Sequence, residues 1–323
     1  MRKMKIIRTR ICLMTLGLTI CGSFCTGQLQ AQQIPHFTNF LFNAFAINPA
    51  NAGLQDCLDA RVGYRNQWPG FEDHPRTVFA SAHQRINSIS RDKGVIHGAG
   101  VIAQGDITGP TGRTSFHAAY AVHLPISRRT RLAFGVGVGV FQYRFDLSQI
   151  NVPQSGDPLL QASNTEFVFP DINAGLWLYG KNWFAGFSGG HLTNPTLSDI
   201  GNSLNMQPHF NLMGGRIFEV GEKMSYIPAA QFKFTGNSTP SLDVNFWADY
   251  DNLIALGVAF RSEDAVAGLI KFNFLDYFTI AYAYDFTYSK VRLGPSNAHE
   301  IILGINACPR SQKMGFVPCN AYY

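Results

Sequence analysis

The first 31 residues of this 323-residue chain contain no Asp or Glu. They contain five of its 26 Lys and Arg residues, all within the first ten positions. The rest of the chain carries 21 basic side chains, the 26 less these five, against 21 acidic ones, so it is formally neutral. The net charge of +5 therefore belongs to the N-terminus. A neutral chain lacks the clustered basic surplus of a nucleic-acid binder, and no nucleic-acid partner is expected.

Long apolar runs are also missing after residue 31. No stretch of about 20 apolar residues follows it, which disfavours membrane-spanning helices. Residues 1–31 themselves have a cationic start, an apolar stretch from Ile11 to Phe24 and the small residue Ala31 near their end. This is the layout of a secretory signal peptide, which we expect to be cleaved near Ala31. The alternative is an uncleaved or lipid-modified anchor, with Cys21 or Cys25 as the modified residue.

Cysteines are few, and three of the six lie in the first 31 residues. The other three are Cys57, Cys308 and Cys319, and no Cys-x-x-Cys pair occurs, which disfavours a thiolate zinc site. In an oxidising compartment Cys308 and Cys319 could form a disulfide, the alternative being three unbonded thiols. No His-Glu-x-x-His motif occurs either, and we expect no metal, no cofactor and no catalytic residue.

What the chain has in abundance is alternation of apolar with small or polar residues at a period of two, which is typical of β-strands. In 252–261 the apolar residues Ile254, Leu256, Val258 and Phe260 oppose Ala255, Gly257, Ala259 and Arg261. A soluble sandwich gives the same alternation. Three properties favour a membrane β-barrel instead: segments of about 10–14 residues, a signal for export, and aromatic residues near the segment ends. These aromatics are Trp68, Phe71, Tyr143, Phe145, Tyr179, Trp183, Tyr277 and Tyr288.

About fourteen strands are predicted, an even number that returns both ends of the barrel to one side of the membrane. They are 58–67, 75–86, 95–106, 112–124, 131–146, 166–179, 182–192, 208–218, 223–234, 241–249, 252–261, 264–273, 277–286 and 298–306. If the first strand runs outward, the longest connections (147–165, 192–207 and 287–297) are extracellular. The fold class is therefore an all-β, antiparallel up-and-down transmembrane barrel.

Four segments follow from this reading. Residues 1–31 are the signal peptide, 32–57 an N-terminal segment, 58–306 the barrel, and 307–323 a C-terminal tail. Residues 32–57 are too apolar for a free tail, with Ile34, Phe37 and Phe40 among their side chains. We expect them to pack in the lumen or across its periplasmic mouth.

Two short motifs stand out. Residues 48–53 read as a turn, because Pro fixes φ, Asn caps backbone groups and Gly permits positive φ. Residues 64–71 close the first strand, and Arg65 and Gln67 should face the lumen while Tyr64 and Trp68 suit a membrane interface. For both motifs the alternatives are a purely structural role and direct contact with a partner protein. The candidate residues are Asn48, Pro49, Ala52, Gly53, Tyr64, Arg65, Asn66, Gln67, Trp68, Phe71, Ser81 and His83.

These motifs resemble the PorP/SprF family of type IX secretion membrane proteins. The similarity includes the mature start 32–37, the Asn-Pro-Ala-x-Ala-Gly element at 48–53 and Tyr-Arg-Asn-Gln-Trp-x-Gly-Phe at 64–71. It continues through Ser81-x-His83, 142–146, 170–176, 184–188, His191-Leu192 and 299–301. The resemblance implies an outer-membrane barrel, often tied to gliding motility. It also implies as partners outer-membrane lipid, a secreted adhesin with a C-terminal sorting domain, and periplasmic ring and motor components.

Three functions remain as hypotheses. The first is a barrel that docks and supports export or surface retention of secreted adhesins. The second is a passive porin or hydrophobic-solute transporter. The third is an outer-membrane enzyme built on Ser81 and His83, which share a strand face but lack an identifiable third group.

Overall fold

The computed structural model describes residues 36–86, 94–146, 165–194, 196–197, 204–205, 207–236, 238–275, 277–289 and 297–307. Helix in this part of the chain is limited to two short pieces, α2 (Ala44–Ile47) and the 3-10 turn η1 (Pro49–Asn51). Over the described ranges we find no helix with the length and apolar character needed to cross a membrane.

Long antiparallel strands make up most of the structure. They are β1 (Asp59–Gln67), β2 (Arg76–Arg85), β3 (Ile96–Thr108), β4 (Thr111–Ser127), β5 (Thr130–Phe145), β6 (Thr165–Gly180), β7 (Trp183–Gly190), β10 (His209–Arg216), β11 (Phe218–Val220), β12 (Met224–Thr235), β13 (Ser238–Tyr250), β14 (Ile254–Arg261), β15 (Ala265–Phe274), β16 (Phe278–Thr287) and β17 (Ala298–Asn306). A separate hairpin, β8 (Thr196–Leu197) with β9 (Leu204–Asn205), lies within the connection between β7 and β10.

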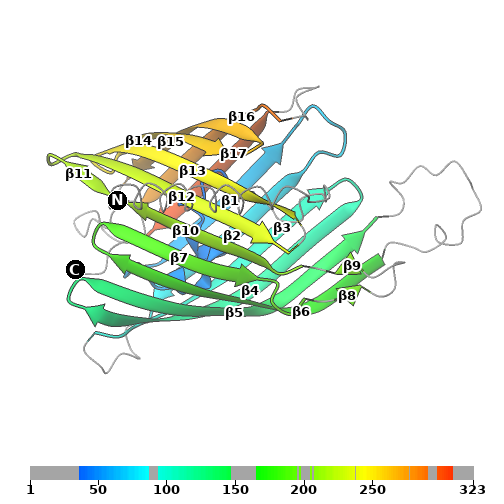
Figure 1. Ribbon diagram of the computed structural model, residues 1–323, viewed down its shortest axis with the longest axis horizontal. Helices are drawn as coiled ribbons and strands as arrows, with labels where there is room; N and C mark the ends of the chain where they lie inside the picture. The colour runs from blue at the N-terminus through cyan, green and yellow to red at the C-terminus, as the bar shows by residue number, and fades with distance from the viewer. Residues whose placement is uncertain are drawn as a thin grey trace, which may run out of the picture.

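The sheet closes on itself, because β1 pairs with β17 from Asp59↔Asn306 to Gln67↔Ala298 (Figure 1). β10 pairs with both β7 and β12, and β11 continues along β12 after a break at Ile217. Counting β10 and β11 as one, the wall has fourteen strands. The predicted fold class and strand number are confirmed, although the β8–β9 hairpin falls where only a loop was expected.

The two faces of the wall differ as the alternation predicts. In β14, Leu256, Val258 and Phe260 are exposed on the outside, whereas Ala255 and Arg261 are buried toward the lumen. A closed sheet with an apolar outer band is one of the two designs that satisfy all backbone groups in lipid. The aromatic residues divide between the faces. Trp183, Tyr277 and Tyr288 are exposed, but Tyr143 and Tyr179, expected at the membrane interfaces, are buried, and the Tyr179 hydroxyl bonds to lumen residue His123.

Residues 36–57, called here the plug, lie inside the barrel. Phe40, Leu41 and Phe42 are buried in one cluster with Trp177 and Trp247 of the wall. The N-terminal segment thus lies in the lumen, one of the two positions predicted for it. The plug joins β1 at Leu58, whose carbonyl oxygen accepts a hydrogen bond from the Ala307 N–H (2.9 Å), so both ends of the wall lie at the same end of the barrel.

The connections fall at two ends because neighbouring strands are antiparallel. We call the end that carries the β1–β2, β3–β4, β5–β6, β7–β10, β12–β13, β14–β15 and β16–β17 connections the loop end, and the opposite end the turn end. The three longest predicted connections join strands at the loop end. Most of their residues, the signal peptide 1–31 and the tail from 308 onward lie outside the described residues.

Candidate functional site: the plugged lumen

Thr38 is the point where the plug is tied most densely to the wall. Its N–H donates to Glu300 Oε2 (2.8 Å), and its carbonyl oxygen accepts from Asn245 Nδ2 (2.9 Å). Its hydroxyl donates to Asp285 at 2.9 Å and accepts from Arg65 Nη1 (2.8 Å). Every polar group of this residue therefore has a partner on the wall.

The wall residues around Thr38 form a buried ionic network. Arg65 Nη2 lies 2.6 Å from Asp285 Oδ2 and Arg65 Nη1 3.2 Å from Glu300 Oε2, and all three side chains are buried. Arg261 extends the network to Asp243 (3.0 Å) and to the Thr38 hydroxyl (3.1 Å). Buried charges are costly unless paired, so removing any one of these partners would leave an uncompensated charge inside the barrel.

His36 joins the same network from the plug. Lys233 Nζ donates to His36 Nδ1 (2.9 Å) and also lies 2.6 Å from Asp243 Oδ2. Burial, followed by the neighbouring charges of Lys233 and Arg261, lowers the pKa of His36 well below its ordinary value. His36 is therefore a neutral acceptor at neutral pH.

The opposite side of the plug is held mainly by neutral groups. The exception is Arg85 of β2, which forms an ion pair with Asp56 of the plug and donates to the Gly53 carbonyl (3.4 Å). Asn48 caps η1 by accepting from the Ala50 N–H (2.9 Å), and its Nδ2 donates to the Leu176 carbonyl of β6 (3.0 Å). The Asn48 amide lies so close to β6 that a Cβ at Gly175 would overlap it. The turn expected at 48–53 thus exists, but its side chains face the wall.

Two histidines of the wall complete this second side. His83 Nδ1 accepts from the Gly53 N–H (3.3 Å), and His123 Nε2 donates to the Ala52 carbonyl (2.8 Å). Gly53 has φ +72°, and a Cβ on it would overlap Gly98 of β3, while a Cβ on Gly98 would overlap the Ala52 carbonyl. The Gly-against-Gly contact lets plug and wall approach at backbone distance. Ala52 is fully buried in the same region, and Pro49 is buried.

The second motif, 64–71, divides between the two faces and the loop end. Arg65 is buried in the lumen, whereas Tyr64 is exposed on the outer face. Trp68 follows β1 with φ 56°, and its N–H donates to the Asn297 carbonyl (3.1 Å), while the Phe71 N–H donates to the Trp68 carbonyl (3.0 Å). Asn66 and Gln67 complete the strand in register with His299 and Ala298. The motif therefore closes β1 against β17.

Ser81 and His83 are both buried on the lumen face of β2, as their spacing requires. His83 uses Nδ1 to hold the plug, and its ring lies 4.5 Å from that of Phe45. A further serine, Ser188, lies in Gly186–Gly190, a Gly-x-Ser-x-Gly motif that sequence reasoning missed. In hydrolases that motif forms a turn between a strand and a helix. Here it lies within β7, and Ser188 Oγ donates to the Ile47 carbonyl of the plug (2.9 Å).

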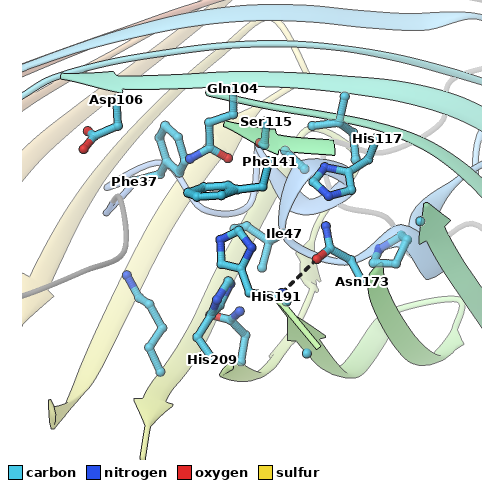
Figure 2. Close-up of a pocket in the computed structure, with 18 of the residues that line it drawn as sticks. Phe37, Ile47, Gln104, Asp106, Ser115, His117, Phe141, Asn173, His191 and His209 are labelled. Atoms are coloured by element: carbon cyan, nitrogen blue, oxygen red, sulfur yellow. Dashed lines mark hydrogen bonds between the residues drawn. The ribbon is translucent and has the colours of Figure 1, made fainter. Parts of the chain in front are cut away.

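A cavity, called here the vestibule, lies between the plug and the loop end (Figure 2). Its cavity volume is about 100 Å³. The plug contributes Phe37, Ile47 and Pro49, and the wall contributes polar and aromatic side chains from β3, β4, β5 and β10. Gln104, Ser115, His117, Phe141 and His209 are among them. Sequence reasoning missed this group, because its members share no motif and come together only when the sheet closes.

Beside the vestibule, the carboxylate of Asp171 accepts hydrogen bonds from two histidines. His117 Nε2 (2.9 Å) and His191 Nδ1 (2.8 Å) both donate to its Oδ2. The His191 ring lies 5.2 Å from that of His209. Within the described ranges, no group of three or more His, Cys, Asp or Glu is arranged to hold a metal ion.

Cys57, at the junction of plug and β1, is disulfide-bonded. Cys308 and Cys319, for which a mutual disulfide and unbonded thiols were the alternatives, lie outside the described residues, but the bond at Cys57 rules out three unbonded thiols.

Comparison with protein families decides what the plugged barrel is. The family model for the type IX secretion system membrane protein PorP/SprF matches residues 29–305. The chain belongs to this family. The expected family and its outer-membrane barrel fold are both confirmed, and the chain is an outer-membrane component related to type IX secretion. No curated protein matches the chain.

Solved structures share the PorP/SprF chain's fold at low sequence identity. The toluene transporter TbuX of Ralstonia pickettii is 12% identical with a TM-score of 0.51, over 81% of this chain and 93% of TbuX. A FadL homologue of Pseudomonas aeruginosa is also 12% identical, with a TM-score of 0.47, over 84% of this chain and 94% of the homologue. These likenesses concern the barrel fold alone.

Proposed function

We propose that the chain is a docking component of the type IX secretion system, and that its role is not enzymatic. In this role it binds a secreted adhesin with a C-terminal sorting domain, and periplasmic ring and motor components of the machine. It supports export or surface retention of the adhesin and gliding motility. The loop end faces the outside, as in outer-membrane barrels generally, and the signal peptide is cleaved near Ala31.

The observation that carries this proposal is the plug. An open transporter needs a passage, whereas here residues 36–57 occupy the lumen and are bonded to opposite sides of the wall. A barrel whose centre is filled by its own chain offers a rigid scaffold for partners.

The vestibule favours a second candidate function, the passage or capture of a hydrophobic solute. Its lining includes Phe37 and Phe141, and such mixed apolar cavities are typical of small-molecule sites. Docking is preferred because the plug lies directly beneath this cavity.

Deletion of the gene separates these functions. The docking role predicts that one surface adhesin is lost while uptake of small hydrophobic solutes is unchanged. Co-purification with a tagged barrel and mass spectrometry then names the partner. Unchanged secretion together with altered solute uptake would refute docking and support transport. Lipase activity that disappears in a Ser81→Ala variant would instead support an enzyme.

A further inference from the structure

At the loop end, β6 has an edge beside which the described residues place no strand. β5 pairs with it over its full length, from Thr165↔Phe145 to Gly180↔Thr130. β7 pairs with it only from Ala174 to Tyr179. Within the part of the chain that the structure describes, residues 165–173 thus have a strand on one side only, an unusual condition in a closed barrel.

The backbone groups along this edge can be assigned one by one. Ile172 donates its N–H to Asp171 Oδ1 (2.9 Å), and its carbonyl oxygen accepts from the Leu192 N–H (3.0 Å). Pro170 has no N–H, and its carbonyl oxygen accepts from Thr193 Oγ1 (2.9 Å). The edge at 170–172 is therefore protected by a proline, by two side chains and by the backbone N–H of Leu192.

Glu166 and Val168 lie four and two residues before Pro170 on the same strand, so their backbone groups point to the same side as those of Pro170. Backbone groups alternate in direction along a strand, so the N–H and C=O of these two residues face the open side, like those of Pro170 and Ile172. Among the described residues, no hydrogen bond to these four groups is found on that side. Unprotected strand edges are templates for pairing with another extended chain.

The outer surface becomes polar at this height. Gln142 Nε2 donates to Glu166 Oε2 (3.1 Å), and Arg144 lies directly opposite Glu166 in the register. An apolar lipid band ends where the outward side chains become polar, so the edge at Glu166 lies above the hydrocarbon. Val168 is 62% exposed beside it. On the inner face Phe167 and Phe169 stack at 6.3 Å, and an added strand would place alternate side chains next to them.

We propose that the open edge of β6 at Glu166 and Val168 binds an extended segment of the secreted partner as an added β-strand. The inference rests on the proposed docking function and names the surface that performs it. Main-chain hydrogen bonds supply affinity in this mode, and the flanking side chains supply selectivity. Pro170 ends the added strand on the membrane side, because it has no N–H to offer.

Proline at position 168 tests the inference. Val168→Pro removes an N–H that points to the open side and leaves the β5 ladder intact, as Pro170 does two residues away. Val168→Thr is the matched control, since it is β-branched and keeps the N–H. Glu166→Pro with control Glu166→Gln repeats the test at the second residue. Each variant is expressed in the deletion strain, and its amount in the outer membrane is checked first.

The secreted protein that disappears on gene deletion is the probe. Both proline variants are expected to reduce its co-purification with the tagged barrel at least fivefold, and its surface level with it, while the two controls behave as the unmodified chain. Normal co-purification with both proline variants overturns the inference and leaves the docking function standing. A deletion without effect on secretion overturns both.

Hydrogen exchange on the purified barrel adds a second test. The amides of Glu166 and Val168 are expected to exchange at least tenfold faster than those of Phe167 and Phe169, which bond to β5. Slow exchange at 166 and 168 would mean that the chain or a second copy already covers the edge, and would overturn the inference.

Discussion

The plug is held by two sides of the lumen that work by different means. Strands β1, β13, β14, β16 and β17 hold Thr38 through charged side chains, among them Arg65, Asp285 and Glu300. Strands β2, β3, β4 and β6 hold residues 48–53 mainly through neutral hydrogen bonds and glycine contacts, to which Arg85 of β2 adds one charged donor at the Gly53 carbonyl. Stability should therefore depend on side-chain charge at the first side and mainly on side-chain volume at the second. Each prediction below tests that division.

The largest effect is expected from Asp285→Ala. This change leaves Arg65 and Arg261 buried with one carboxylate fewer, and breaking a buried ion pair costs about 3–5 kcal/mol. The free energy of unfolding in lipid vesicles, measured by urea titration, should fall by that amount. Asp264→Ala is the control, since Asp264 contacts the same Arg261 but its side chain is more exposed than that of Asp285 (15% against 2%), and it should cost less. Equal losses would contradict a charge-dependent side.

An intermediate effect is expected from Gly98→Val on the close-packed side. Its side chain would overlap the Ala52 carbonyl, and such overpacking costs about 1–3 kcal/mol. Urea titration and protease digestion of the plug measure the loss. Gly268→Ala is the control, because no atom lies within 4 Å of an added Cβ there. A tolerated valine at position 98 would show that the plug does not need this contact.

The smallest effect is a pH dependence on the ionic side. The folded-state pKa of His36 is lowered, so below pH about 6.5 the unfolded chain binds more protons than the folded one. The stability that His36 contributes is present above this pH and is lost as the pH falls, by at most about 1.4 kcal/mol per pH unit. Unfolding titrations between pH 7 and 5 should show this slope to be steeper than in His36→Gln. Equal pH slopes for the unmodified chain and the His36→Gln variant would show that His36 does not contribute to stability through this network.

The wall could be predicted from sequence because alternation is local. The period of two placed Leu256 outside and Arg261 inside, and it gave Arg65 its lumen position. Pairing in the lumen could not be predicted. Arg65 meets residues more than 200 positions away, and nothing in the local pattern selects Asp285 or Glu300 from the other acidic side chains. Tyr179 was misplaced for a related reason, because a position near a strand end does not determine whether the side chain points to the lipid or to the lumen.

The open edge of β6 was equally hidden. Alternation indicates where a strand lies but not how far its neighbour extends, and the predicted range 182–192 for β7 exceeds the observed Trp183–Gly190 by three residues. The disulfide bond of Cys57 was not predicted either, because the spacing of the cysteines suggested only Cys308 and Cys319 as partners.

Ion conductance of the purified chain in a planar lipid bilayer tests most directly whether the plug fills the lumen. The unmodified chain should show no steady conductance. A variant that combines Asp285→Ala with Gly98→Val, which releases the plug on both sides, should conduct. Steady conductance of the unmodified chain, unchanged in the variant, would contradict the plugged lumen and favour a transporter.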